Sequence, residues 1–231
     1  MSILGRSSRP GEPEEVGTES LPALSDTKLR TGIGGLDQML GGGIPSSSTL
    51  IVAGPPGAGK TTLAQQTAYS LAAGGRKTLY LNTLTQPVVK LVRDLQGFSF
   101  FDPSHFNIRV KYHDLSDGLR GSQMTDLPTV LSGLAQKHEP SLVVVDSVRP
   151  ALEGMENPAM LRRFVYGLSN LSIEASAVVM LLGEYGEAEL MSQPEAAVVD
   201  GIISLTSPYQ SDHGQRWVRI LKMRGARHIA S

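Results

Sequence analysis

Residues 54–61, GPPGAGKT, form the most specific motif in the sequence. Its spacing of glycine, lysine and threonine fits the phosphate-binding loop pattern in full. The glycines let successive backbone N–H groups point at a phosphate, and the helix that begins near Lys60 adds its N-terminal dipole. An apolar run precedes the loop and a helix-like segment follows it, which argues against a glycine-rich turn that carries a lysine by chance. We therefore predict a nucleoside triphosphate site on a strand–loop–helix unit.

The loop pattern gives its residues distinct roles toward a nucleotide and a metal ion. Lys60 is expected to reach the β- and γ-phosphates, and the Thr61 hydroxyl to bind Mg²⁺. Asp146 ends the apolar run SLVVVD, where a carboxylate can hold the same Mg²⁺ through water. The expected nucleotide contacts in the loop are Gly54, Pro55, Pro56, Gly57, Ala58, Gly59, Lys60, Thr61 and Thr62.

Strand-like and helix-like segments alternate from residue 31 onward. The strand-like runs are rich in Val, Leu and Ile, as in a mostly parallel sheet covered by helices on both faces. A turn-like segment, SPYQSDHGQ, separates the last two runs and predicts an antiparallel hairpin at a sheet edge. The expected strands are residues 48–54, 77–82, 106–113, 141–146, 176–184, 201–206 and 215–225. The expected helices are residues 63–75, extended back to near Lys60, and 87–98, 126–138 and 159–175.

Composition narrows the class of protein. Lys and Arg total 21 against 22 Asp and Glu, so a net charge of -1 gives no sequence-wide attraction to nucleic acid or to an anionic membrane. The absence of cysteine excludes disulfides and thiolate zinc sites. No apolar run is long enough to span a bilayer and no secretory signal is visible, so we expect a cytoplasmic protein. Residues 1–28 are rich in Ser, Pro, Gly and Glu and predict a disordered tail, with residues 29–231 as one nucleotide-binding domain.

Residues 31–66, TGIGGLDQMLGGGIPSSSTLIVAGPPGAGKTTLAQQ, resemble the opening of RecA-like ATPases of the KaiC and RadA type. Those families begin with a Thr-Gly-Ile-x-x-Leu-Asp segment and a glycine-rich turn ahead of the phosphate loop. The resemblance continues to VVDGIISL and ILKMRGARH, so it covers about residues 31–228, and its ending is similar to KaiC more than to RecA. It implies a RecA-like α/β core, ATP with Mg²⁺, and assembly of identical subunits into a hexameric ring.

The resemblance also implies that the last strand contacts a neighbouring subunit. In the family, the final strand pair reaches the neighbour's nucleotide. Matched residue by residue, Lys222, Arg224 and His228 would make this contact, with the backbone around Met223 and Ala226 near the base and ribose. Without the resemblance, Lys-x-Arg on an edge strand fits a solvated face equally well. The chain ends soon after this motif, where the family usually continues, and we expect ring assembly to be weaker for that reason.

One feature that the family usually has is missing. KaiC-type domains carry one or two glutamates after the strand that follows the phosphate-loop helix, but the matching segment here is LNTLTQP, residues 81–87. Asn82 or Gln86 could orient an attacking water by hydrogen bonding, yet neither can take its proton at neutral pH. Glu184, which ends a later apolar run, is a second candidate for the catalytic base or for a sensor of nucleotide state. An ordinary acid at the start of a loop is an equally good interpretation of Glu184.

These features favour an ATP-binding KaiC-like protein with slow or impaired hydrolysis, which acts in signalling or as a scaffold. Its ring and its N-terminal tail would then be the surfaces open to a signalling partner. The alternative is a RadA-type recombinase that acts on DNA, which needs basic loops. The candidate loop at residues 183–201 has four glutamates and an aspartate without Lys or Arg, and residues 149–163 set three arginines against two glutamates. An autokinase ranks last, because the chain ends before a segment that would present a Ser/Thr pair.

We predict that the chain does not bind single-stranded DNA at moderate salt, even with ATP present. The acidic loop would repel the phosphate backbone, whose neutralisation by basic residues drives such binding. Fluorescence anisotropy of a labelled oligonucleotide measures this. Tight binding that weakens steeply with salt would restore the recombinase interpretation.

Overall fold

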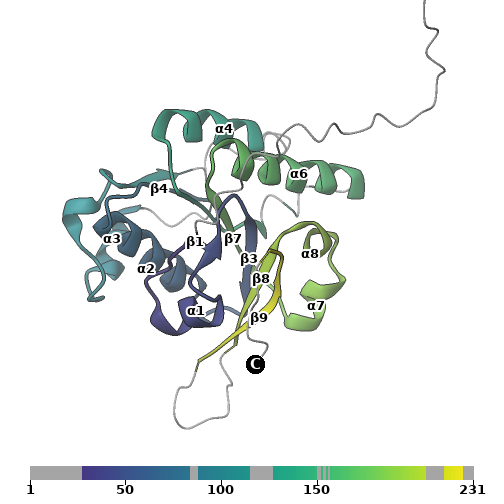
Figure 1. Ribbon diagram of the computed structural model, residues 1–231, viewed down its shortest axis with the longest axis horizontal. Helices are drawn as coiled ribbons and strands as arrows, with labels where there is room; N and C mark the ends of the chain where they lie inside the picture. Colours follow the sequence, from purple (N-terminus) through teal and green to yellow (C-terminus); the bar gives the residue numbers. More distant parts are fainter. Residues whose placement is uncertain are drawn as a thin grey trace, which may run out of the picture.

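The computed structural model describes residues 28–83, 88–114, 127–149, 152, 155, 157–206 and 216–225. Its centre is a seven-stranded sheet with the strand order β5-β4-β6-β7-β3-β8-β9 (Figure 1). The first six strands in this order are parallel to one another, and β9 pairs antiparallel with β8 at the edge. The predicted α/β fold, with its mostly parallel sheet and antiparallel edge pair, is confirmed. The predicted tail lies outside the described residues.

The boundaries of the elements are close to those expected from the sequence. The strands of the large sheet are β3 (Thr49–Gly54), β4 (Thr78–Asn82), β5 (Val110–Asp114), β6 (Leu142–Asp146), β7 (Val178–Glu184), β8 (Gly201–Thr206) and β9 (Trp217–Met223). The helices are α1 (Gly34–Met39), α2 (Lys60–Ala73), α3 (Val88–Leu95), α4 (Leu127–His138), α6 (Pro158–Glu174), α7 (Glu187–Ser192) and α8 (Pro194–Val198), with a 3-10 turn η1 at Pro103–His105. A separate antiparallel pair joins β1 (Lys28–Leu29) to β2 (Ile44–Pro45).

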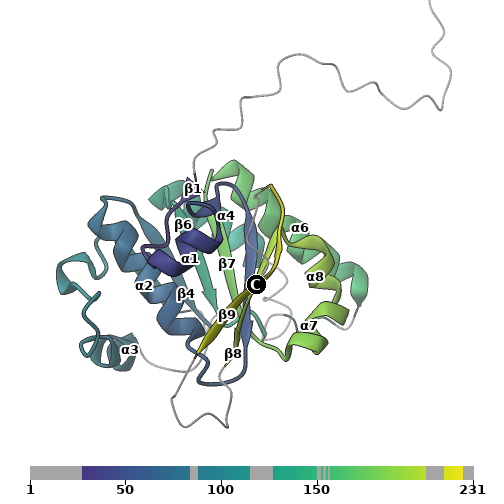
Figure 2. The same ribbon diagram turned by 60° about the horizontal axis from the view of Figure 1, so that its bottom comes forward.

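Helices cover both faces of the sheet, which explains why the central strands are apolar along their whole length. Every residue of β3 and β6 is buried. One hydrophobic core forms beneath α1, α2 and α3, and a second beneath α4, α6, α7 and α8 (Figure 2). None of the helices in the described part of the chain has the length and apolar character that a membrane crossing requires.

The Thr-Gly-Ile-x-x-Leu-Asp segment folds around the carboxylate of Asp37. This carboxylate accepts hydrogen bonds from the Thr31 N–H at 2.8 Å, the Thr31 hydroxyl at 2.7 Å and the Gly32 N–H at 3.1 Å. Gly32 has a φ of 74°, and a side chain there would collide with Ser70 on α2. Leu36 is buried in the core below α2. The segment therefore anchors the start of the domain to the helix that follows the phosphate loop.

The structure corrects two expectations about local structure. Strand β5 begins at Val110 instead of residue 106, because Asn107 adopts a φ of 51° and the chain turns there; Asn tolerates this left-handed conformation better than most residues. Residues 183–201, expected to be a loop, contain α7 and α8. Acidic residues in the first turn of α7 suit the helix dipole, and Pro194 occupies the first turn of α8.

Two substitutions within α6 test the packing of the second core. Leu168 is 0% exposed and Ile173 is 65% exposed on the same helix. Leu168→Ala should lower the free energy of unfolding by about 2–5 kcal/mol, because it leaves a cavity under the sheet. Ile173→Ala is the matched control and should change it by no more than about 0.5 kcal/mol. Urea unfolding measures both, and equal effects would contradict the placement of α6.

Candidate nucleotide-binding site

The candidate site lies at one edge of the sheet, where the parallel strands end. Gly54 at the end of β3 lies beside Glu184 at the end of β7, and Asn82 at the end of β4 lies beside Asp146 at the end of β6. In open α/β sheets, ligands bind outside the carboxyl ends of the strands. Sheet pairing thus brings together residues that are far apart in the sequence and that the motifs had singled out one by one.

Glycines give the phosphate loop its shape. Gly57 and Gly59 have φ values of 76° and 100°, in the left-handed region that residues other than glycine rarely adopt. A side chain on Gly54 would collide with the carbonyl oxygen of Leu205 in β8. The loop therefore curls tightly, and α2 begins at Lys60 with its N-terminus at the end of the loop. This arrangement of N–H groups and helix dipole favours an anion.

Lys60 folds back over the loop. Its Nζ donates to the carbonyl oxygens of Gly54 at 2.8 Å and Pro55 at 3.0 Å. Burial lowers the pKa of Lys60, while the negative charges of Glu184 and Asp146 oppose that shift. The ammonium group thus lies where a phosphate could replace two neutral carbonyls as its acceptor. Charge-assisted hydrogen bonds of this kind are roughly twice as strong as neutral ones.

Asp146 joins the phosphate-loop helix to the middle of the sheet. Its Oδ2 accepts a hydrogen bond from the Thr61 hydroxyl at 2.9 Å and another from the Tyr80 hydroxyl at 2.7 Å. Burial raises the pKa of this carboxyl, and the hydrogen bonds from Tyr80 and Thr61 and the charge of Lys60 oppose the rise. Because the Thr61 proton points at Asp146, the lone pairs of its oxygen remain free for a cation. Hydroxyl and carboxylate oxygens are the ligands that Mg²⁺ prefers, so the residues present fit that ion.

The described part of the segment that lacks the family's glutamate, residues 81–83, is closely packed against β6. Thr83 is 7% exposed, and its hydroxyl accepts from the Ser147 N–H at 2.8 Å and donates to the Ser147 carbonyl at 2.5 Å. The Thr83 N–H donates to the Asp146 carbonyl at 2.9 Å. The hydroxyl of Thr83 is therefore engaged by backbone, whereas Asn82 lies directly opposite Asp146 in the sheet register. Gln86 lies outside the described residues.

Two charged side chains lie at the rim of the site. Glu184 is exposed at the end of β7, beside the start of the phosphate loop. Arg216, immediately before β9, brings its Nη1 within 3.4 Å of the point that a Cβ on Gly59 would occupy. Sequence reasoning missed Arg216, because only the antiparallel pairing of β8 and β9 returns the chain to the loop. It also missed Tyr80, which contacts Asp146 only because β4 and β6 are neighbours.

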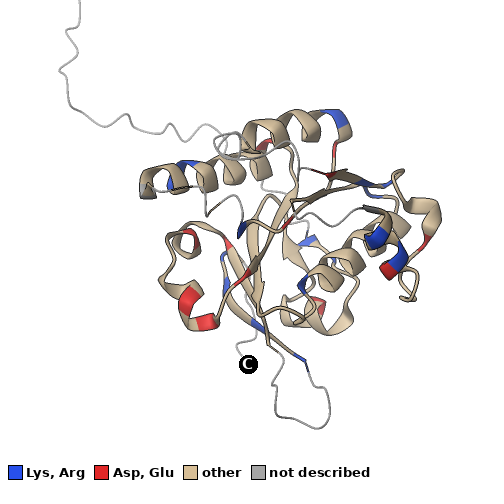
Figure 3. Cartoon of the chain, turned by 180° about the vertical axis from the view of Figure 1, so that it is seen from behind, with Lys and Arg blue, Asp and Glu red and all other residues tan. Residues whose placement is uncertain are grey.

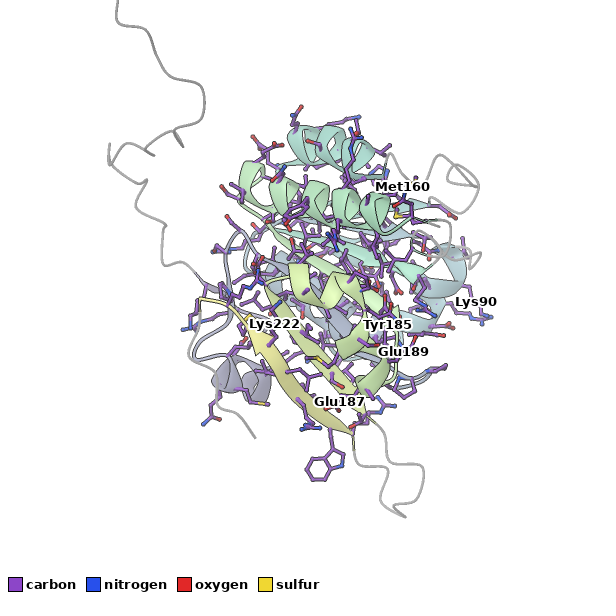
Figure 4. The ribbon with its side chains drawn as sticks, turned by 90° about the vertical axis from the view of Figure 1, so that its right-hand side faces the viewer. Lys90, Met160, Tyr185, Glu187, Glu189 and Lys222 are labelled. Carbon is purple, nitrogen blue, oxygen red and sulfur yellow. The ribbon has the colours of Figure 1, made fainter. Side chains whose placement is uncertain are left out.

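Lys222 and Arg224 lie away from this chain's own phosphate loop. Lys222 donates to the carbonyl oxygens of Ala196 at 2.8 Å and Ala197 at 3.1 Å, at the end of α8 (Figure 4). Arg224 donates to the carbonyls of Ala197 at 2.9 Å and Val198 at 3.2 Å. Both cations thus occupy the negative end of a short helix. Met223 pairs with Gly201 at the start of β8, and His228 lies outside the described residues.

The charged residues of α7 and α8 are all acidic (Figure 3). Glu189 pairs with Arg149 at 3.5 Å, and Glu187 pairs with Arg219 at 2.7 Å. Arg149 also lies over the ring of Tyr185, 5.0 Å from its centroid. Arg149, one of the three arginines of the candidate DNA-binding segment 149–163, is therefore held against an acidic helix.

The comparisons with known proteins agree with this arrangement. A family model described as the KaiC ATPase matches residues 29–231. The chain belongs to this family. It is 27% identical over 214 residues to the circadian clock oscillator protein KaiC of Picosynechococcus, an alignment that covers 87% of this chain and 41% of that protein. The chain thus spans about two fifths of that relative.

Two other similar proteins are closer to this chain in length. A UPF0273 protein of Methanopyrus kandleri is 25% identical over 217 residues, which cover 87% of this chain and 85% of that protein. A crystal structure of a KaiC-like protein from Pyrococcus horikoshii aligns with a TM-score of 0.74 and 22% identity over 89% of this chain and 92% of that one. At that identity, the structural match shows the shared fold alone. The predicted membership of the RecA-like ATPases of KaiC type is confirmed.

Proposed function

We propose that this KaiC-family domain binds Mg-ATP in the loop between β3 and α2 and hydrolyses it slowly. The observation that carries the proposal is the Thr61–Asp146 hydrogen bond of 2.9 Å beneath a fully formed phosphate loop. Lys60 would then bind the β- and γ-phosphates, and Thr61 and Asp146 would hold Mg²⁺. Arg216, whose Nη1 lies 3.4 Å from the point that a Cβ on Gly59 would occupy, would be a second cation near the same phosphates. A bound Mg²⁺ would neutralise charge on the phosphate oxygens.

Slow hydrolysis is supported by the residues at the position where KaiC-type domains usually carry a glutamate. Asn82 lies opposite Asp146 in the sheet register, and the Thr83 hydroxyl is hydrogen-bonded to the Ser147 backbone. An amide and a hydroxyl supply no carboxylate that could take a proton. Gln86 would orient the attacking water only by hydrogen bonding. General-base assistance is typically worth ~100- to 10,000-fold in rate. Glu184 is an acid at the rim of the site, and we propose that it is a sensor of the bound nucleotide or a substitute base.

Assembly of identical subunits into a hexameric ring is supported by the position of Lys222 and Arg224. Their strand pairs with the start of β8, where Gly201 lies beside Leu50. The phosphate loop starts at Gly54, four residues farther along β3, roughly 13 Å at about 3.3 Å per residue. These cations would therefore reach a neighbour's nucleotide more readily than their own. His228 and the backbone of Met223 would join them at that contact.

Within such a ring, bound ATP would act mainly as a structural ligand between subunits. Our proposal includes a signalling or scaffold role in the cytoplasm, with a partner bound through the N-terminal tail. The recombinase alternative is less well supported, because Arg149 is paired with Glu189 and the α7–α8 segment is acidic.

Lys60→Ala should weaken Mg-ATP binding at least ~10-fold, because it removes the only side-chain ammonium held over the described phosphate loop. Equilibrium dialysis measures the affinity. Lys137→Ala is the matched control, since Lys137 is exposed on α4 and should leave the affinity unchanged. Equal affinities for wild type and Lys60→Ala would refute the nucleotide site.

Installing a carboxylate should accelerate hydrolysis if the missing base is the only defect. Asn82→Glu or Gln86→Glu should raise the single-turnover rate of ATP hydrolysis by up to ~100-fold with ATP affinity near wild type. Thr83→Glu should not, because it breaks the hydrogen bonds to Ser147.

The base at the rim is tested by Glu184→Gln in the same assay. We expect little change. A brisk wild-type rate would contradict slow hydrolysis. Its loss in Glu184→Gln would assign the base to Glu184, and its persistence in this variant would contradict the catalytic assignments as a whole.

A further inference from the structure

Tyr80 reaches the metal-binding carboxylate from the neighbouring strand. It pairs with Val144 across β4 and β6, and Asp146 lies two residues farther along β6 on the same face. Diagonal neighbours of this kind lie within reach of an aromatic side chain. The Tyr80 hydroxyl donates to Oδ2 of Asp146 at 2.7 Å. A residue of the sheet interior therefore touches a residue that we assign to the Mg²⁺ site.

The hydrogen bond from the Tyr80 hydroxyl to Asp146 is shielded from water. The side chain is 1% exposed, so water does not compete for the bond. The same Oδ2 also accepts from Thr61. With Oδ2 committed to two protein donors, Oδ1 is the oxygen left for the water molecules around a cation.

Neighbouring side chains hold Tyr80 in this position. Its ring lies against that of Tyr112, with 5.3 Å between the centroids. The Tyr112 hydroxyl donates to Oε1 of Gln65 at 2.6 Å, and Gln65 belongs to α2, the helix that begins with Lys60. Both tyrosines and the helix thus form one packed unit, and Tyr80 has little freedom to move away from Asp146.

We propose that Tyr80 is a positioning residue, which fixes the Asp146 carboxylate so that Oδ1 faces the hydrated metal ion. This inference rests on the proposed Mg-ATP site. It adds a residue that the phosphate-loop and strand-end motifs do not contain. Partners that orient metal-binding groups in this way typically change metal affinity 10- to 100-fold when they are removed.

The test measures metal binding directly. Mn²⁺ is titrated into the protein–ADP complex, with protein in excess over ADP, and the free ion is counted by electron paramagnetic resonance. Tyr80→Phe should weaken Mn²⁺ binding about 10-fold, while the affinity for ADP in EDTA stays within about two-fold of wild type. Loss of metal affinity without loss of nucleotide affinity is a pattern that general loosening of the core would not give.

Tyr112→Phe is the matched control. It removes a hydroxyl with a 2.6 Å hydrogen bond from the adjacent ring, but this hydroxyl binds Gln65 and not Asp146. It should therefore keep the wild-type affinity for Mn²⁺. Equal weakening in both variants, or wild-type affinity in Tyr80→Phe, would overturn the positioning role. If wild type itself takes up no Mn²⁺ in the presence of ADP, the proposed Mg-ATP site fails and the role of Tyr80 fails with it.

A second measurement covers the case in which Tyr80→Phe does not fold. 3-Fluorotyrosine is placed at residue 80 or at residue 112, and the fluorine NMR signal of the ADP complex is followed as Mg²⁺ is added. The signal at residue 80 should shift on metal binding and that at residue 112 should not. An unmoved signal at residue 80, with Mg²⁺ bound, would overturn the proposal.

Discussion

The hydrogen bond between Thr61 and Asp146 is the contact on which the candidate site depends. It joins the helix that follows β3 to the end of β6, and β7 lies between these two strands in the sheet. The bond can form only if the strands are parallel and end at the same level. The apolar residues that bury β3 and β6 on both faces enforce this alignment. Packing of the core therefore sets the geometry at the phosphate loop.

The sequence was sufficient to predict what is local. The glycines of the loop, the role of Lys60 in it and the continuous apolar strands each follow from a few adjacent residues, and the fold was predicted on that basis. Contacts that depend on strand order could not be predicted in this way. Tyr80 contacts Asp146 because β4 and β6 are neighbours, and Arg216 reaches Gly59 because β9 returns antiparallel to β8. Neither adjacency leaves a pattern in the chain.

Short helices and strand ends were also difficult to predict from the sequence. The segment that contains α7 and α8 has too few residues per helix to show a hydrophobic period, and its acidic residues are typical of loops as well. The start of β5 was placed too early, because the apolar residue Ile108 continues the alternation while Asn107 turns the backbone. Both differences arise because tertiary contacts and single-residue conformations override a weak periodic signal.

The contacts of Lys222 and Arg224 with α8 have a consequence for how subunits would associate. To reach a neighbour's nucleotide, these side chains must leave carbonyl oxygens that already satisfy them. The exchange makes about as many hydrogen bonds as it breaks, so its driving force is the charge of the new acceptor. A helix C-terminus offers roughly half an elementary charge, whereas the terminal phosphate of ATP carries more than one. The affinity between subunits would then depend on which nucleotide is bound. The carbonyl oxygens at the end of α8 would compete with that nucleotide for Lys222 and Arg224, so only a sufficiently charged phosphate would draw them away.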